Sequence, residues 1–442
     1  MKMKSLASAI GLSLLAITSL AGCNKKTETL TVWTFSNELK DIADQYYTKA
    51  TGQKVKVSIK SSVTQIKTDL RNAVNRGKNI PDVVALEAAV IADFTSVSED
   101  ESYLMDLSDI DGTDDMYAYT KSVATSTDGK VLGLSWQATP GGFFYKRSIA
   151  AKLGINSPEA MQTAISTWDN YLALAEQCAN YDLDESKDGK QAIAICSSIL
   201  DPIKVFLSAR ENPWVVNNNL QTETIMFGKK EGETNCFDVV RALEQEGYSH
   251  KTQDRGSGWV TDIDSNNTLG YFCSSWGLNF DLMPNADTSF GDWAMCKAPV
   301  DYFKGGTWLA SVKGCEHAES AKEFIKYVTT NVEFLTKRGS ETGDFMNSKS
   351  VMSELIKDYS CAFLGGQNHL AILYEVANNI NGELISPYDA VIESEFNSAV
   401  ADFAQARCNN EEEVEAARTR FKASFVGAVK SDYPTIVYNP NN

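Results

Sequence analysis

Four of the eight tryptophans stand where an aromatic side chain can face a ligand. Trp33 ends a strand-like segment, and Trp136, Trp276 and Trp308 lie at strand ends or in glycine-rich turns rather than within helices. An indole ring has a flat apolar face and one polar edge, so it suits the C–H face of a sugar ring while nearby amides and carboxylates bind the hydroxyls. Packing in a core is the more frequent role of a single tryptophan. For this set at strand ends we favour ligand binding.

Patterns typical of catalysis do not occur in the sequence. The three histidines, His250, His317 and His369, are scattered, and none belongs to an H-E-x-x-H motif. The chain has neither a G-x-S-x-G elbow nor a G-x-x-x-x-G-K-[ST] phosphate loop. Two of the 58 acidic residues could form the carboxylate pair of a secreted glycosidase, but no spacing singles out such a pair. We therefore expect no enzyme, no catalytic residue and no cofactor.

One acidic segment, residues 184–189, imitates the start of a calcium-binding loop, because oxygen-bearing side chains alternate before a glycine. The twelfth position of this loop is Ile195 instead of the glutamate that completes such a site. A hydrophilic turn explains the segment better, so we expect no metal site.

The cysteines allow two interpretations. An even number in an exported chain favours disulfides, and Cys178 and Cys196 are spaced to close a hairpin-sized loop. Alternatively, many of them pack as small buried hydrophobic residues. The absence of C-x-x-C excludes a zinc ribbon and a thioredoxin-type site. The cysteines that follow Cys23 are Cys178, Cys196, Cys236, Cys273, Cys296, Cys315, Cys361 and Cys408.

The first residues have the pattern of an export signal. Lys2 and Lys4 precede an apolar stretch that is too short to span a bilayer, so residues 1–22 are predicted to be a signal peptide. Leu20-Ala21-Gly22-Cys23 resembles the bacterial lipobox, whose cysteine is diacylated and becomes the new N-terminus. Two acyl chains hold a protein stably on a membrane. We expect an extracytoplasmic protein anchored by a lipid on Cys23, on the periplasmic or cell-surface side. The alternative is an ordinary signal peptide with a coincidental cysteine.

Net charge and chain length limit the partners and the architecture that the protein can have. The formal charge of −17 makes a surface that repels phosphate backbones, so nucleic acid is not an expected partner. No segment beyond the signal approaches the ~20 apolar residues of a transmembrane helix. About 420 residues follow the signal, which is too many for one hydrophobic core and suits two lobes.

Apolar periodicity predicts alternating strands and helices in the first part of the chain. Strands are expected at residues 30–33, 55–59 and 83–86, separated by helices at 39–50 and 63–76. This order predicts parallel strands with right-handed crossovers. Ligands collect beyond the carboxyl ends of such strands. Here those ends are Trp33 to Phe35, Ser61-Ser62 and Glu87.

The later chain carries weaker signals. Paired glycines before an apolar run at 143–145 predict a crossing between lobes and then a strand. Residues 157–179 are expected to be helical, and residues 192–196 and 269–276 to form strands. Gly305-Gly306-Thr307-Trp308 is a glycine-rich approach to another strand, and the last quarter is predicted to be largely helical.

Segments along nearly the whole mature chain resemble the extracellular sugar-binding proteins of ABC importers, the family of maltose-binding protein and its lipoprotein relatives. Each segment is short and apolar, and their number and order carry the resemblance. They are residues 30–35, 81–84, 136–145, 212–216, 270–272, 275–276, 291–296, 305–310, 342–347 and 363–368.

The resemblance implies an α/β protein with the two-lobed periplasmic-binding-protein fold of type II. The two lobes of such a protein close like a Venus flytrap about a hinge of crossing strands. We expect the crossings near Thr139, Trp308 and Thr342. The first lobe is predicted to hold residues 23–139 and 309–342, and the second lobe residues 140–308 and 343–442.

The resemblance also places ten ligand-binding residues between the lobes. Trp276 falls where relatives stack a sugar. The chain lacks the aromatic and acidic run that follows the third strand of maltose-binding protein, which argues against maltose as the ligand. The other nine residues are Trp33, Glu87, Trp136, Thr139, Trp214, Thr307, Trp308, Asp344 and Phe345.

Binding rather than catalysis is the activity that the resemblance implies. We expect a monomer that captures a mono- or oligosaccharide and, in its closed form, delivers it to the permease subunits of an ABC transporter. The main alternative is a non-sugar solute such as a peptide or polyamine, which would call for charged cleft residues where we expect aromatic ones.

Overall fold

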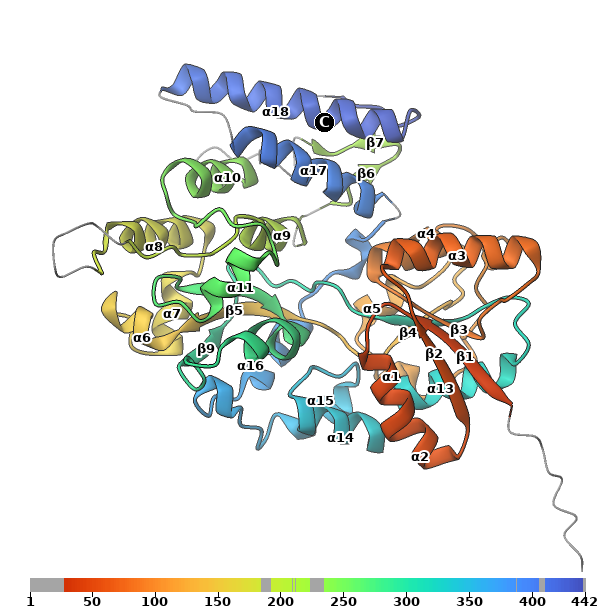
Figure 1. The fold of residues 1–442 in the computed structure, drawn as a ribbon. Coiled ribbons are helices and arrows are strands. Elements are labelled where there is room, and N and C mark those ends of the chain that lie inside the picture. The colour runs from red at the N-terminus through yellow and green to blue at the C-terminus, as the bar shows by residue number, and fades with distance from the viewer. Residues whose placement is uncertain are drawn as a thin grey trace, which may run out of the picture.

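The computed structural model describes residues 28–183, 192–208, 210, 212–222, 234–386, 388–404 and 410–439. The predicted signal peptide, Cys23, the acidic segment 184–189 and Cys408 lie outside these residues. Among the helices of the described part, none is both long and apolar enough to cross a membrane. The described chain forms two α/β lobes, which confirms the predicted fold class (Figure 1).

A five-stranded mixed sheet lies at the centre of the first lobe, in the order β2-β1-β3-β10-β4. β1 pairs in parallel with β2 and β3, whereas β10 runs antiparallel to β3 and β4. β3 is buried along its whole length, as a central strand with both faces covered should be. The strands are β1 (Thr29–Thr34), β2 (Lys54–Ile59), β3 (Val83–Leu86), β4 (Leu134–Ser135) and β10 (Trp308–Ser311).

The first-lobe helices begin and end at capping residues. α3 (Val63–Arg76) begins after Ser62, whose side chain accepts a hydrogen bond from the backbone N–H of Gln65, and it ends at Gly77 in the left-handed conformation. Figure 1 shows helices on both faces of the sheet. The others are α1 (Glu38–Ile42), the π-helical turn η1 (Ala43–Tyr47), α2 (Thr48–Thr51), α4 (Ala88–Thr95), α5 (Ala118–Ser122) and α13 (Ala318–Thr330).

A three-stranded antiparallel sheet, β8-β5-β9, lies at the centre of the second lobe. All of β5 is buried, because its alternating side chains pack into two different cores. Phe144 belongs to the core that includes the first lobe, whereas Phe143 and Tyr145 belong to a second core. A Cβ on Gly142 would lie 2.7 Å from the backbone oxygen of Cys296, so glycine allows this close strand pairing. The strands are β5 (Gly141–Lys146), β8 (Gly270–Ser274) and β9 (Trp293–Cys296).

Helices from distant parts of the chain close the second core. α18 (Glu411–Asp432) buries Phe421 and Phe425 and lies along α17 (Asp389–Ala404), at the top of Figure 1. The remaining elements of this region are α6 (Arg147–Lys152), α7 (Pro158–Ala164), α8 (Trp168–Asn180), α9 (Leu200–Ser208), β6 (Val215–Val216), β7 (Asn219–Leu220), α10 (Cys236–Gln245) and α11 (Ser257–Ile263).

Three segments of the described part of the chain run between the lobes. The first leads from β4 to β5, the second from β9 to β10, and the third follows α14 (Val332–Thr342) toward α15 (Lys349–Leu355) and α16 (His369–Ala377). Isolated bridges pair Gln137 with Met346 and Pro140 with Phe303, so the first segment pairs with both of the others. The exact lobe boundaries given above stay a prediction.

Three predicted elements differ from the structure. The helix expected at 157–179 is two helices, because the side chain of Thr167 caps a new helix start at α8. Residues 192–196 form isolated bridges instead of a strand. The strand expected to reach Trp276 ends at Ser274, where the chain turns into the short helix α12 (Ser275–Gly277).

The seven cysteines in the described part of the chain are free thiols, and six of them are buried. Cys178 and Cys196, which are spaced to close a loop, both lie unpaired in the second core. Burial raises the pKa of the Cys178 thiol to about 12, which keeps it protonated and unreactive. For these seven residues the structure favours packing over disulfide formation.

Candidate ligand-binding site

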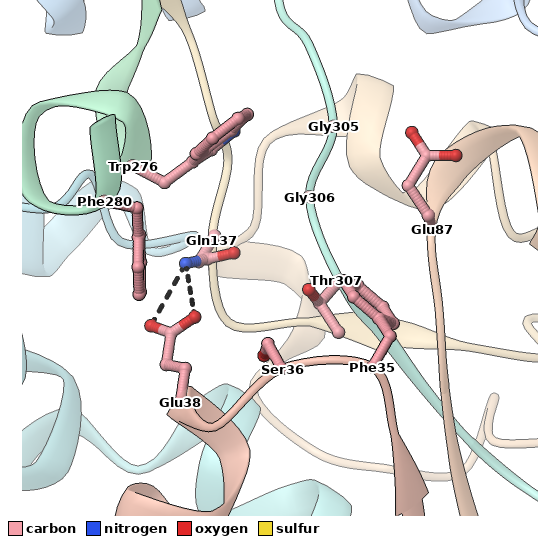
Figure 2. Close-up of a pocket in the computed structure, with 10 residues that line it drawn as sticks. All are labelled: Phe35, Ser36, Glu38, Glu87, Gln137, Trp276, Phe280, Gly305, Gly306 and Thr307. Carbon is pink, nitrogen blue, oxygen red and sulfur yellow. Dashed lines mark hydrogen bonds between the residues drawn. The ribbon is translucent and has the colours of Figure 1, made fainter. Parts of the chain in front are cut away.

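A pocket of about 300 Å³ lies between the lobes, beside the connecting segments. Its size falls at the lower end of the range for small-molecule sites. Figure 2 shows Trp276 and Phe280 on one side, with Gln137 and Glu38 at the floor. The lining residues are Phe35, Ser36, Glu38, Glu87, Gln137, Trp276, Phe280, Gly305, Gly306 and Thr307.

Trp276 is held in place at the pocket wall. Its indole Nε1 donates a hydrogen bond to the backbone oxygen of Lys304 at 3.0 Å. The guanidinium carbon of Arg255 lies 5.1 Å from the ring centroid, and Arg255 is itself paired with Asp281 at 2.8 Å. The ring is only partly buried and lines the pocket. A fixed aromatic surface favours stacking, because little conformational freedom is lost when a ligand binds.

Phe280 extends this aromatic wall. It stands four residues after Trp276 on the continuous helical segment of α12 and the π-helical turn η4 (Leu278–Leu282). Its side chain keeps 49% of its surface exposed although it is large and apolar. The two rings therefore offer adjoining apolar surface to one ligand.

The pocket floor is a hydrogen-bonded network centred on Gln137. Its Nε2 donates to Oδ2 of Asp344 at 2.8 Å and lies 3.2 and 3.3 Å from the two carboxylate oxygens of Glu38. Arg338 donates to Glu38 at 3.0 Å, and the hydroxyl of Ser275 donates to Asp344 at 2.6 Å. The network thus runs from α1 in the first lobe, through two connecting segments, to α12 in the second.

Both carboxyl groups in this network have raised pKa values. Burial, together with the nearby Asp344 carboxyl, raises the pKa of Glu38 to about 7 against the opposing effect of Arg338. Burial also raises the pKa of Asp344. Because two buried carboxyl groups share one guanidinium, the network favours retaining a proton.

The glycine-rich loop before β10 lets the backbone pass next to Trp276. Gly305 and Gly306 have φ values of 70° and 97°, which glycine adopts without strain. A Cβ on Gly305 would lie 3.2 Å from Nε1 of Trp276. The loop therefore supports the indole, and it places Thr307 on the pocket lining.

Three of the ten predicted ligand residues line the pocket: Glu87, Trp276 and Thr307. Asp344 lies directly beneath it, bonded to Gln137. The structure thus brings four of the ten together at one site.

Four other predicted residues are buried where the segments cross. Trp136 and Phe345 have no exposed surface, and Thr139 and Trp308 are 1% exposed. The indole of Trp308 donates to the backbone oxygen of Thr120 at 2.8 Å. Full burial leaves these side chains no surface for a ligand, so here they pack the hinge.

Trp33 and Trp214 lie away from the pocket. Trp33 is partly buried on β1, with the ammonium of Lys60 4.1 Å from a ring centroid. Trp214 is fully buried in the second core, where its ring packs against Phe396 and Phe425. In this structure both have packing roles.

Sequence reasoning missed most of the polar floor. The carboxyl end of β1 is followed by Phe35, Ser36 and Glu38. Because ligands collect beyond the carboxyl ends of parallel strands, the sequence indicated this region but did not single out these residues as ligand contacts. Gln137 gave no separate signal beside Trp136. Phe280 could not be found from the pattern, because its exposure depends on the direction taken by the helical segment after β8.

The side chains at the site can bind a small ligand. Aromatic rings, hydroxyls, an amide and two carboxyl groups meet around a cavity that suits a small polar ligand with apolar faces. Within the described residues, no three His, Cys, Asp or Glu side chains are grouped to hold a metal ion.

Two α/β lobes, paired connecting segments and a pocket between them define a two-lobed solute-binding protein. The family model for bacterial extracellular solute-binding proteins matches residues 42–351, well over half of the chain. The chain therefore belongs to this family, which acts outside the cytoplasm by binding substrates. A comparison with curated protein sequences gives no match.

Solved structures share the fold over almost the entire length. An extracellular solute-binding protein of family 1 has a TM-score of 0.73 at 18% identity, covering 91% of this chain and 99% of that one. An ABC transporter-associated binding protein of B. animalis subsp. lactis Bl-04, in complex with β-1,6-galactobiose, has a TM-score of 0.67 at 22% identity, covering 90% of this chain and 98% of that one. The galacto-N-biose/lacto-N-biose I-binding protein of Bifidobacterium longum has a TM-score of 0.68 at 17% identity, covering 91% of this chain and 97% of that one.

Proposed function

We propose that the protein is the substrate-binding lipoprotein of an ABC importer, and that it captures a mono- or oligosaccharide between its lobes. One observation carries the proposal: an aromatic wall of Trp276 and Phe280 stands over a floor of Gln137 and Glu38. The rings suit the C–H face of a sugar, and the amide and carboxylate oxygens suit its hydroxyls. Structures with the same fold that were solved with β-1,6-galactobiose, lacto-N-biose or tagatose support this choice of ligand class.

A sugar in the pocket favours the closed form because it contacts both lobes. Phe35, Ser36 and Glu38 belong to the first lobe, whereas Trp276 and Phe280 belong to the second. A ligand that bridges both sets binds the closed arrangement more tightly and shifts the equilibrium toward it. The closed protein then docks on the permease subunits, and its opening releases the sugar.

Export and anchoring complete the proposal. Removal of residues 1–22 leaves Cys23 as the lipid-bearing N-terminus, and the polar residues between Cys23 and β1 tether the first lobe to the membrane. The protein acts as a monomer that is confined near its permease.

The test is a thermal-shift screen of the purified protein lacking residues 1–23 against mono- and oligosaccharides, with spermidine and short peptides as competing ligand classes. A ligand at 100 times its Kd adds about 2.7 kcal/mol of stability, which is easily detected. A shift with spermidine or peptide but with no sugar would refute the carbohydrate assignment. Turnover of chromogenic glycosides would support the glycosidase alternative instead.

The same screen on Trp276→Ala tests the site. We expect the sugar affinity to fall on the order of 30-fold or more, as for a central aromatic contact. Trp33→Ala, a tryptophan outside the pocket, is the control and should retain the wild-type affinity. An unchanged Kd for the Trp276 variant would place the ligand elsewhere.

A further inference from the structure

The amide of Gln137 can face the pocket with one end only. Its Nε2 lies within hydrogen-bond distance of two carboxyl groups, Asp344 at 2.8 Å and Glu38 at 3.2 and 3.3 Å. An amide nitrogen has two hydrogens to donate, and both find acceptors here. The reversed amide would bring its oxygen against two carboxyl groups that hold one proton between them, so at least one carboxylate would repel it. The two carboxyl groups therefore fix the orientation of the side chain.

This orientation turns the amide oxygen of Gln137 into the pocket. Figure 2 shows the nitrogen toward Glu38 and the oxygen directed away from it, toward the space in front of Thr307. Because both amide hydrogens are engaged, Gln137 can only accept a hydrogen bond from a ligand. A ligand must present a donor such as a hydroxyl at this point.

The charges around the pocket act in the same direction. Its ten lining residues include two carboxyl groups, Glu38 and Glu87, and no lysine, arginine or histidine. Two arginines beside the pocket are already paired: Arg338 with Glu38 beneath the floor, and Arg255 with Asp281 behind the ring of Trp276. Lys304, which precedes Gly305, lies near the carboxylates of Asp201 and Asp254. A carboxylate or phosphate on the ligand would meet the amide oxygen of Gln137, and no basic side chain lines the pocket to bind it.

We propose that Gln137, oriented by Glu38 and Asp344, makes this pocket specific for uncharged sugars that donate a hydroxyl to its amide oxygen, and that uronic acids and sugar phosphates are excluded. This inference rests on the proposed function, which it deepens by naming the ligand class and a specificity-determining residue. Ser275 takes part as a positioning residue, because its hydroxyl holds Asp344 at 2.6 Å.

The first test compares matched ligands on the wild-type protein by isothermal titration calorimetry. The probes are galactose with galacturonate and galactose 1-phosphate as its charged counterparts, together with β-1,6-galactobiose and spermidine. We expect a neutral sugar to bind at least 100-fold more tightly than its charged counterpart. Equal or tighter binding of the uronic acid or phosphate overturns this inference and leaves the proposed function standing. Binding of spermidine alone, or of no saccharide, contradicts the proposed function itself.

The second test is a double-mutant cycle between Gln137 and a ligand hydroxyl. Gln137→Met removes the amide oxygen but keeps the length of the side chain. Monodeoxy analogues of the bound neutral sugar should identify one hydroxyl whose loss weakens wild-type binding about fivefold to tenfold. In the variant the loss of that hydroxyl should have no further effect. If every deoxy analogue binds more weakly than the parent sugar by the same factor in both proteins, Gln137 does not bind a hydroxyl of the sugar.

Gln367→Met is the matched control for this cycle. The amide of Gln367 bonds the backbone of Met295 through both its oxygen and its nitrogen, at 2.8 and 2.7 Å, and it lies outside the pocket. We expect this variant to lose stability but to keep the wild-type pattern of deoxy-sugar affinities. If Gln137→Met fails to fold, the matched-ligand comparison on the wild-type protein still decides the proposal.

Discussion

Phe280 and Phe290 form a matched pair for measuring what the aromatic wall contributes. Both are unusually exposed, at 49% and 58%, but only Phe280 lines the pocket, whereas Phe290 packs edge-on against Phe363 at 5.6 Å. Phe280→Ala should weaken sugar binding about tenfold, because an apolar contact in a desolvated site is lost. Phe290→Ala should leave the Kd unchanged. Calorimetric titration with the same sugar checks both, and equal effects would mean that Phe280 is not in contact with the ligand.

The raised pKa of Glu38 makes stability depend on pH in a predictable direction. Its value rises from 4.5 to about 7, so between these limits the folded protein holds a proton that the unfolded chain has released. The free energy of unfolding therefore falls as the pH rises through this window and levels off above it, by roughly 3 kcal/mol for this group. Glu38→Gln removes this titrating group. The variant should therefore lose less stability between pH 5 and 8 than the wild-type protein does.

Melting temperatures of both proteins across that range provide the measurement. Asp201 and Glu393 also have raised pKa values, of about 6 and about 7, and they contribute slopes of the same sign. Both groups remain in the variant, so the difference between the two curves reports the pair of Glu38 and Asp344, which share Arg338. Parallel curves would show that Glu38 titrates at its ordinary pKa in the folded protein.

At the scale of an element, a matched pair of glycines distinguishes the specific role of the loop before β10 from the general effect of a left-handed backbone conformation. Gly305 and Gly52 have similar φ values, 70° and 74°, but a Cβ on Gly305 would meet Trp276 at 3.2 Å while one on Gly52 meets nothing within 4 Å. Alanine at either position should lower stability by about 1 kcal/mol. Only Gly305→Ala should also weaken sugar binding. Equal affinities of the two variants would mean that the loop does not position the indole.

The first lobe was largely predictable because its signals are local. Val63–Arg76 and Val83–Leu86 have the predicted bounds, since a capping serine, a left-handed glycine and an apolar run mark their ends. The second sheet joins β5 to β8 and β9, more than 100 residues further along the chain, so local periodicity could not pair these strands. The helical segment after β8 was missed for the same reason, and Phe280 with it.

The candidate site was predictable only in outline. Trp276 and Trp308 both follow strand-like or glycine-rich segments, yet one lines the pocket and the other is buried with its Nε1 bonded to Thr120. The sequence pattern is the same for both, and tertiary packing decides which ring stays exposed. Glu38 and Gln137 stand 99 residues apart and meet only because a connecting segment passes the start of α1. Such polar networks leave no periodic trace in a sequence.

At the scale of the whole molecule, the floor network links pocket and hinge. Ser275 on α12, Asp344 and Gln137 on connecting segments and Glu38 on α1 form one chain of hydrogen bonds between the lobes. Gln137, the residue proposed to accept a ligand hydroxyl, is therefore also part of the contact between the lobes. A ligand bound to Gln137 and stacked on Trp276 would contact the middle of this chain and the residue next to its second-lobe end, and in this way binding would favour one arrangement of the lobes.

The lipid proposed on Cys23 would confine ligand binding to the membrane surface. A receptor confined to the membrane surface has a high effective concentration at its permease, which no change in its pocket could supply. Cys23→Ala should leave the Kd for sugar unchanged in vitro, because the pocket is built from residues 35–307. In cells the variant should move from the membrane fraction to the soluble fraction, lose labelling by a fatty-acid analogue and reduce uptake at low sugar concentration. Retention of the label would place the acyl chains on another residue, and unchanged uptake by unanchored protein would show that tethering is dispensable for delivery.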